Sequence, residues 1–190
     1  MTESAGAHRG SFDPERIIGT LNAHGVQYVV IGAIAAIAHG APVGATFDVD
    51  FTPARDPQNL ARLSDALREL DARIRTDAVE GGLPFAHDAA SLATMQMLNL
   101  TCRHGDFDLA FAPSGTGGYD DLVRGSESLI IGSVEVRVAS LEDVIRSKEA
   151  AGRPKDIAVL PVLEQHARRM REGTGGSGSG PSSPPPPSSG

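Results

Sequence analysis

The chain has 190 residues, 40% apolar and 22% charged, which suits one compact domain with loose ends and leaves little room for two. Its net charge of −7 argues against a protein that binds nucleic acid through its whole surface, because that requires a generally basic face. The single cysteine excludes an internal disulfide and a cysteine-cluster zinc site. With no run of about 18 apolar residues and no signal-peptide core, we expect a soluble, cytoplasmic protein.

The first half of the chain alternates helix and strand signals. Asp13-Pro14 supplies a helix cap and a first-turn proline, and Asp56-Pro57 repeats that signal before leucines at three-and-four spacing. The strand signals are a β-branched run that ends at a glycine and a run that alternates polar and apolar residues. The predicted elements are a helix over 14–24, a strand over 27–31, a helix over 33–39, a strand over 46–52 and a helix that begins after the second Asp-Pro pair.

The second half predicts further strands and two closing helices. Arg103-His104-Gly105 supplies a turn between two strands, and Ser140 caps a helix. The predicted elements are a loop over 76–93 with a helical turn after Asp88, strands over 95–102 and 106–111, a hairpin over 129–138, a helix from Ser140 to about Gly152 and a helix from about Pro154 to Arg171. The alternation of helices and strands predicts one α/β domain over residues 13–171.

Both ends of the chain differ in composition from this domain. Residues 1–12 lack a hydrophobic pattern, and we expect a flexible N-terminus there. After Glu172 the chain consists almost entirely of Gly, Ser and Pro, with nothing apolar to bury. Residues 172–190 therefore predict a disordered tail.

Two carboxylates share one face of the predicted strand 46–52. The apolar face carries Phe47, Val49 and Phe51, and the polar face carries Thr46, Asp48 and Asp50. Carboxylates at i and i+2 have Cα atoms roughly 6–7 Å apart, close enough to bind one hard cation such as Mg²⁺. Asp108 lies on the strand 106–111, which antiparallel pairing would bring beside the first two. Together the three predict a metal site able to hold two ions.

A candidate phosphate site lies one short helix upstream of these carboxylates. Gly32 ends the strand 27–31 and begins the next helix, so its turn exposes backbone N–H groups with positive helix-end character. A phosphate docked there would face a cation held by Asp48 and Asp50. The alternative is that both aspartates belong to the solvent face of an edge strand, since an isolated D-x-D is common.

In these motifs the sequence resembles the nucleotidyltransferases of the DNA polymerase β superfamily. Their signature is a strand ending in Gly-Ser or Gly-Gly, a helix, a D-x-D on the next strand and a later third Asp. Within this superfamily the chain looks like the AbiEii and MenT type toxins, over residues from about 15 to 165. The segments that carry the likeness are VIGAIAAIAHG, TFDVDFTPA, GDFDLAF, RSKEAAG and RPKDIAVL. The resemblance implies a minimal polymerase-β-like fold, a mixed sheet flanked by helices.

The resemblance also implies an activity and its residues. Asp48 and Asp50 would bind Mg²⁺ or Mn²⁺, and Asp108 would complete the metal site or activate the attacking hydroxyl. Lys148 and Asp156 would support the nucleotide phosphates and the site geometry. The implied nucleotide-binding residues are Gly32, Ala33, Thr46, Lys148 and Lys155. The implied reaction moves a nucleoside monophosphate from an NTP to the 3′ end of tRNA, as the toxin of a toxin–antitoxin pair with a separate antitoxin partner.

Two alternatives stay open at this point. The same site could transfer a nucleotide to a small molecule such as an antibiotic, which the acidic net charge favours. A catalytically silent binding module is the other, because Ala33 replaces a usual Gly or Ser and Val43-Gly44 stands where many relatives carry Arg. In favour of an RNA acceptor, residues 137–171 hold eight basic and five acidic residues.

Overall fold

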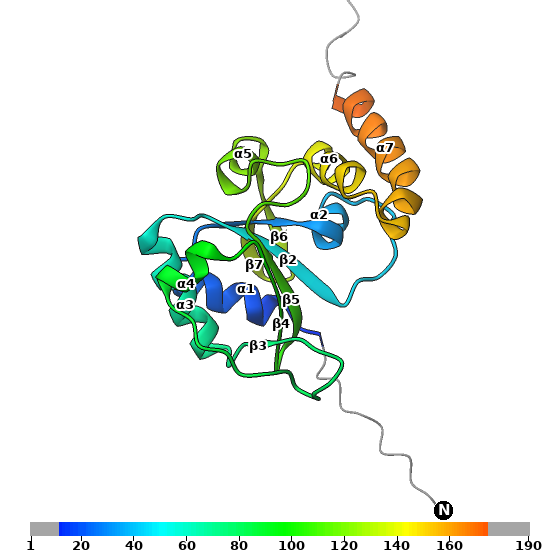
Figure 1. Ribbon diagram of the computed structural model, residues 1–190. Coiled ribbons are helices and arrows are strands. Elements are labelled where there is room, and N and C mark those ends of the chain that lie inside the picture. Colours follow the sequence, from blue (N-terminus) through cyan, green and yellow to red (C-terminus); the bar gives the residue numbers. More distant parts are fainter. Residues whose placement is uncertain (1–11, 175–190) are drawn as a thin grey trace, which may run out of the picture.

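A single mixed sheet forms the centre of the structure, a computed structural model that describes residues 12–174 (Figure 1). Within these residues the sheet has seven strands in the order β3-β4-β5-β2-β1-β7-β6. The strands are β1 (Tyr28–Ile31), β2 (Asp48–Pro53), β3 (Arg73–Ile74), β4 (Met97–Cys102), β5 (Gly105–Ala110), β6 (Glu127–Ile131) and β7 (Val134–Val138). The predicted α/β fold, a mixed sheet flanked by helices, is confirmed. Residues 1–11 and 175–190, on which most of the predicted flexible N-terminus and tail falls, lie outside the described residues.

The central strand β2 pairs with β1 in antiparallel orientation and with β5 in parallel orientation. The expected antiparallel pairing of the strands 46–52 and 106–111 is therefore wrong. β5 forms its antiparallel hairpin with β4, and β4 lies on the side of β5 away from β2. The chain between β2 and β5 is long enough for the crossover connection that a parallel pair needs.

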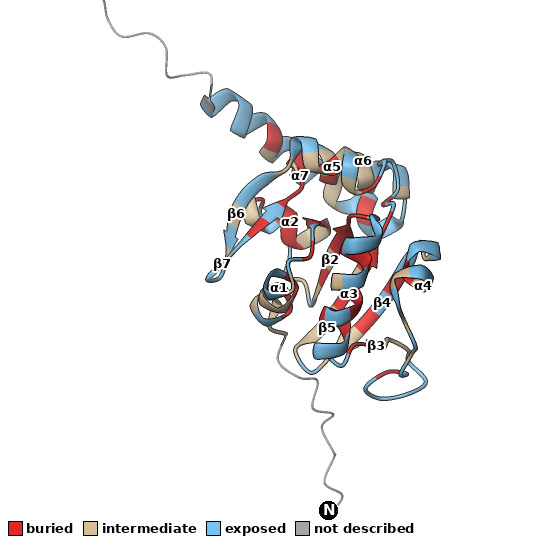
Figure 2. Cartoon of the chain, turned by 90° about the vertical axis from the view of Figure 1, so that its left-hand side faces the viewer, coloured by how far each residue is buried: buried red, intermediate tan, exposed pale blue. Residues whose placement is uncertain are grey.

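The helices form two groups (Figures 1 and 2). In the first, α1 and α3 contact each other and α4 contacts α3; in the second, α6 contacts both α2 and α7. The helices are α1 (Pro14–Ala23), α2 (Gly32–Ala38), α3 (Pro57–Glu69), α4 (Ala89–Thr94), α5 (Tyr119–Gly125), α6 (Leu141–Ala151) and α7 (Pro154–Thr174). In the described part of the chain, no helix combines the length and apolar character needed to span a bilayer.

The predicted helix caps and core stripe are present. Asp13 accepts a hydrogen bond from the backbone N–H of Arg16, and Asp56 accepts one from that of Asn59, so each satisfies an N–H that the first helical turn leaves unpaired. The leucine stripe of α3 is buried against the sheet: Leu60, Leu63, Leu67 and Leu70. Figure 2 shows the buried residues concentrated on the central strands and the helix faces that cover them.

Several elements differ from the sequence predictions. The short strand β3 and the helix α5 were not predicted: β3 has two residues, and α5 begins after Gly118 without a side-chain cap. The last helix continues past Arg171 to Thr174, into the segment expected to begin the tail. Phe47 was placed on the core face, but its side chain is 77% exposed because β2 begins only at Asp48.

Candidate active site

Four aspartates lie on one face of the sheet where β2 and β5 run side by side. The parallel register places Asp48 beside Asp106 and Asp50 beside Asp108. The alternate residue Phe107 is fully buried on the other face, as the two-residue period of a strand requires. The predicted carboxylates Asp48, Asp50 and Asp108 are thus brought together, with Asp106 as a fourth.

Thr46 lies beside the first of these carboxylates. Its Oγ1 donates a hydrogen bond to Asp48 Oδ1 at 2.7 Å and is 3.4 Å from the backbone oxygen of Asp48. The hydroxyl therefore orients the Asp48 carboxylate, and its role in lining a nucleotide pocket stays a prediction.

Gly32 lies directly against Asp50. It is the first residue of α2 and has φ of +79°, and a Cβ built on it would be 2.1 Å from Asp50 Oδ2. Both the backbone angle and the contact exclude a side chain here. The turn from β1 into α2, which carries the predicted phosphate-docking residues Gly32 and Ala33, therefore adjoins the carboxylates.

The charge on Asp50 is poorly compensated by the protein itself. Burial, followed by repulsion from Asp48 and Asp108, raises the pKa of Asp50 from 3.8 to about 7, although Lys148 and Lys155 oppose the shift. Within residues 12–174 neither Asp48 nor Asp50 forms an ion pair. Oxygen donors with uncompensated negative charge are what a divalent cation such as Mg²⁺ or Mn²⁺ selects, so this pair fits the predicted metal.

Asp108 has a partner that the sequence did not reveal. Arg75, the residue after β3, donates from Nη2 to Asp108 Oδ1 at 2.7 Å, and its Nη1 is 3.3 Å from Asp106 Oδ2. Burial raises the pKa of Asp108, and Arg75 partly offsets this. As the side chains are placed, no three His, Cys, Asp or Glu of the described residues form a group ready to hold a metal.

The two predicted lysines differ in their surroundings. Lys148 on α6 donates from Nζ to Asp156 Oδ1 at 3.0 Å, and Arg153 donates to the other oxygen of Asp156, which is 1% exposed. Burial raises the pKa of Asp156, but these hydrogen bonds outweigh burial and hold the pKa below its ordinary value. Asp156 therefore joins α6 to α7 as a buried anion. Lys155 is exposed, and its charge acts on Asp50 and Asp108.

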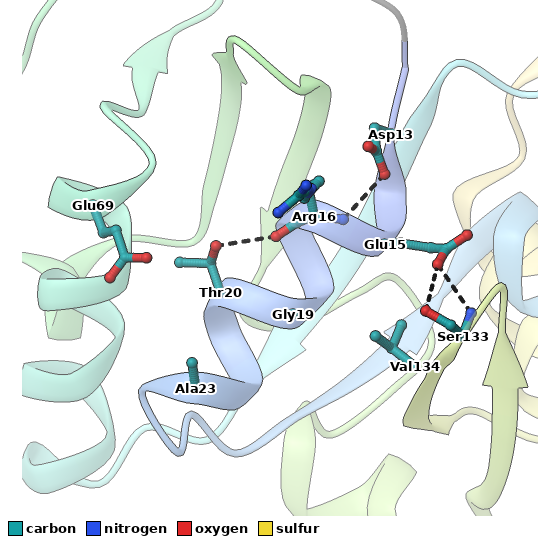
Figure 3. A pocket seen from close by; sticks show the side chains of 9 residues that line it. All are labelled: Asp13, Glu15, Arg16, Gly19, Thr20, Ala23, Glu69, Ser133 and Val134. Carbon is teal, nitrogen blue, oxygen red and sulfur yellow. Dashed lines mark hydrogen bonds between the residues drawn. The ribbon is translucent and has the colours of Figure 1, made fainter.

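A separate pocket of about 540 Å³ lies on α1, away from these residues (Figure 3). Its lining comes from α1, from Glu69 at the end of α3 and from the turn between β6 and β7. Glu15 closes one side, because its carboxylate accepts hydrogen bonds from the backbone N–H and the hydroxyl of Ser133. None of the predicted site residues lines this pocket, so it is not part of the candidate active site.

No protein-family profile and no curated protein matches the sequence. Several solved structures resemble the fold at low sequence identity, among them the three that follow. The solution structure of the antibiotic-resistance factor ANT(2'')-Ia is 14% identical, with a TM-score of 0.51, over 85% of this chain and 91% of that chain. A crystal structure of ANT(2'')-Ia with adenylyl-2''-tobramycin is 14% identical, with a TM-score of 0.49, over 85% of this chain and 96% of that chain.

The third is a Thermotoga maritima protein assigned as a nucleotidyltransferase, 15% identical with a TM-score of 0.49, over 90% of this chain and 99% of that chain. At this identity the likeness concerns the fold alone. The comparison that supports it is the one with the solution structure of ANT(2'')-Ia. The chain therefore shares the fold of ANT(2'')-Ia.

Proposed function

We propose that the protein transfers a nucleoside monophosphate from an NTP to a hydroxyl acceptor. The observation that supports this most strongly is the parallel pairing of β2 with β5, which gathers Asp48, Asp50 and Asp108 on one face beside the Gly32 turn. In the transfer, the acceptor oxygen forms a bond to the α-phosphorus, the bond between that phosphorus and the bridging oxygen breaks, and pyrophosphate leaves.

Each residue of the site has a role in this proposal. Asp48 and Asp50 hold the divalent cation, with Thr46 orienting the Asp48 carboxylate. A bound Mg²⁺ or Mn²⁺ supplies a Lewis acid that stabilises negative charge on the phosphate oxygens. Asp108 takes the proton of the acceptor hydroxyl, since burial makes its carboxylate a stronger base.

The nucleotide would be bound on the side of the site where α2, α6 and α7 meet. Gly32 and Ala33 offer backbone N–H groups to the phosphates. Lys155, which is exposed and acts electrostatically on the aspartates, offers a cation. Lys148 adds positive charge, while its contact with the buried Asp156 keeps α6 and α7 in place around it.

We propose tRNA as the acceptor, within a toxin–antitoxin pair. The support is the resemblance to AbiEii and MenT type toxins together with the surplus of basic residues over 137–171. Arg168 and Arg169 on α7 are exposed, so the end of this helix can attract a polyanion. The cognate antitoxin remains a prediction from the resemblance.

A small-molecule acceptor is the second candidate. One observation favours it: the similar fold of ANT(2'')-Ia belongs to an antibiotic-resistance factor, which has been crystallised with an adenylylated aminoglycoside. The acidic net charge of the chain would also attract a cationic antibiotic.

The test is incubation of the protein with each α-³²P-labelled NTP, Mg²⁺, and either total tRNA or a set of aminoglycosides. The expected result is label on tRNA that is lost in Asp48→Asn and retained in Asp77→Asn, a control in an exposed loop. Label on an aminoglycoside alone would show that the acceptor is a small molecule instead of tRNA, and the proposed nucleotidyl transfer would stand. Nucleotide binding without label on any acceptor would contradict the proposal and leave a binding module.

A further inference from the structure

The four aspartates of β2 and β5 form two columns with different counter-charges. Each column is a D-x-D pair on one strand, and the parallel register sets the two pairs side by side. The β5 column, Asp106 and Asp108, is contacted by Arg75 through two separate nitrogens. The β2 column, Asp48 and Asp50, has no ion pair among residues 12–174. The protein thus supplies a fixed positive charge to the β5 column and no ion pair to the β2 column.

Arg75 is well suited to this task. A guanidinium is always charged and presents several N–H donors in a rigid plane. Its two terminal nitrogens can therefore reach carboxylates at i and i+2 of one strand, here at 2.7 Å and 3.3 Å. Charge-assisted contacts of this kind are the stronger hydrogen bonds in proteins.

The sheet fixes the position of Arg75. Its backbone N–H donates to the oxygen of Asn99 on β4, and the preceding residue, Ile74, pairs with Leu83 through two backbone hydrogen bonds. Gly82 closes this loop so tightly that a Cβ would be 2.6 Å from the Ile74 oxygen. Arg75 is therefore anchored on both sides and reaches across β4 to β5, with a side chain that is only 30% exposed.

We propose that Arg75 takes the place of a second cation at this site. Its guanidinium satisfies Asp106 and Asp108, so the protein binds a single divalent ion, at Asp48 and Asp50. A second ion at the β5 column would have to displace or approach a fixed positive charge, which Coulomb repulsion opposes. This inference rests on the proposed function, because it assumes that Asp48 and Asp50 bind a divalent ion.

The same arrangement defines the part that Asp108 plays. Its Oδ1 is held by Arg75, which fixes the carboxylate and leaves Oδ2 for the acceptor hydroxyl. Asp108 then acts as a base next to the ion rather than as a ligand between two ions. This selects one of the two roles that the resemblance left open for Asp108.

The test counts Mn²⁺ ions bound per chain, by equilibrium dialysis and by the electron paramagnetic resonance signal of free Mn²⁺, without nucleotide. The unmodified protein is expected to bind one ion, Asp48→Asn/Asp50→Asn none, and Arg75→Gln two. The matched control is Arg73→Gln, since Arg73 lies on β3, two residues before Arg75, but pairs with the exposed Asp71. This control is expected to bind one ion.

A second variant decides the matter if Arg75→Gln does not fold. Asp106→Asn/Asp108→Asn keeps Arg75 and is expected to bind one ion, as the unmodified protein does. Two ions in the unmodified protein, one ion in folded Arg75→Gln, or loss of an ion in the β5 double variant would each overturn the role of Arg75. Absence of any Mn²⁺ binding in the unmodified protein would instead overturn the metal site of the proposed function, and the Arg75 inference with it.

Discussion

Asp50 makes the stability of this fold depend on pH in a direction opposite to that of most aspartates. Its pKa is raised from 3.8 to about 7, chiefly by burial and then by its acidic neighbours. An acid with a higher pKa in the folded chain binds its proton more tightly there. The free energy of unfolding therefore falls as pH rises from about 4 to about 7 and stays low above that.

The size of the effect follows from the shift. Each pKa unit corresponds to about 1.4 kcal/mol, so a shift of about three units costs the folded state ~4 kcal/mol at pH 8. Asp50→Asn keeps the shape of the side chain and removes the ionisation. We expect this variant to be more stable than the unmodified protein by up to ~4 kcal/mol at pH 8, and to differ little from it below pH 4.

Urea unfolding at a series of pH values, with EDTA present, measures this difference. The matched control is Asp77→Asn, whose carboxylate lies in an exposed loop and is solvated in both states; its stability difference should not vary with pH. Repeating the series with Mn²⁺ should reduce the advantage of Asp50→Asn, because a bound cation stabilises the ionised form. A pH-independent difference between Asp50→Asn and the unmodified protein would refute this account of the charge at the site.

Two further substitutions test the packing around the site. Gly32→Ala should destabilise the fold by about 2–5 kcal/mol in urea unfolding, because the new Cβ meets Asp50 at 2.1 Å and φ is positive. The control Gly19→Ala, where a Cβ meets nothing within 4 Å, should stabilise the fold by about 0.5–1 kcal/mol. Equal effects of the two substitutions would contradict the close contact between Gly32 and Asp50. Asp156→Asn should cost about 1.5–3 kcal/mol in the same assay, because it removes the buried carboxylate that accepts from Lys148, whose side chain is 17% exposed, and from the exposed Arg153. Glu164→Gln, in an exposed ion pair, should change stability by less than about 1 kcal/mol.

The polar face of β2 could be predicted from the sequence because strand alternation is a local property. The period of two places Asp48 and Asp50 on one side whatever the strand pairs with. Asp108 was found in the same way, from its alternation with Phe107 and Leu109. The same pattern contains Asp106, so the repeated D-x-D of β5 was a signal that sequence reasoning could have used.

The neighbours of these carboxylates could not be predicted, since they depend on long-range pairing. Hydrophobic alternation can be the same in parallel and antiparallel strands. The local sequence therefore did not indicate the orientation of β5 relative to β2. Arg75 is one of fifteen arginines, and its contact with Asp108 spans 33 positions of the chain. Only the order of strands, with β4 between β3 and β5, brings its guanidinium to the site.

The division of charge between the two aspartate columns also bears on substrate binding. If Arg75 offsets part of the charge of Asp106 and Asp108 and one divalent ion neutralises Asp48 and Asp50, the lysines are left to compensate the triphosphate. Lys148 is already shared with Asp156, so Lys155 is the freer of the two. These features would serve an RNA or an aminoglycoside equally well, because both present a hydroxyl to the same phosphorus. We therefore expect surfaces outside the aspartates to select the acceptor, and the exposed basic end of α7 suits a polyanion better than a cationic antibiotic.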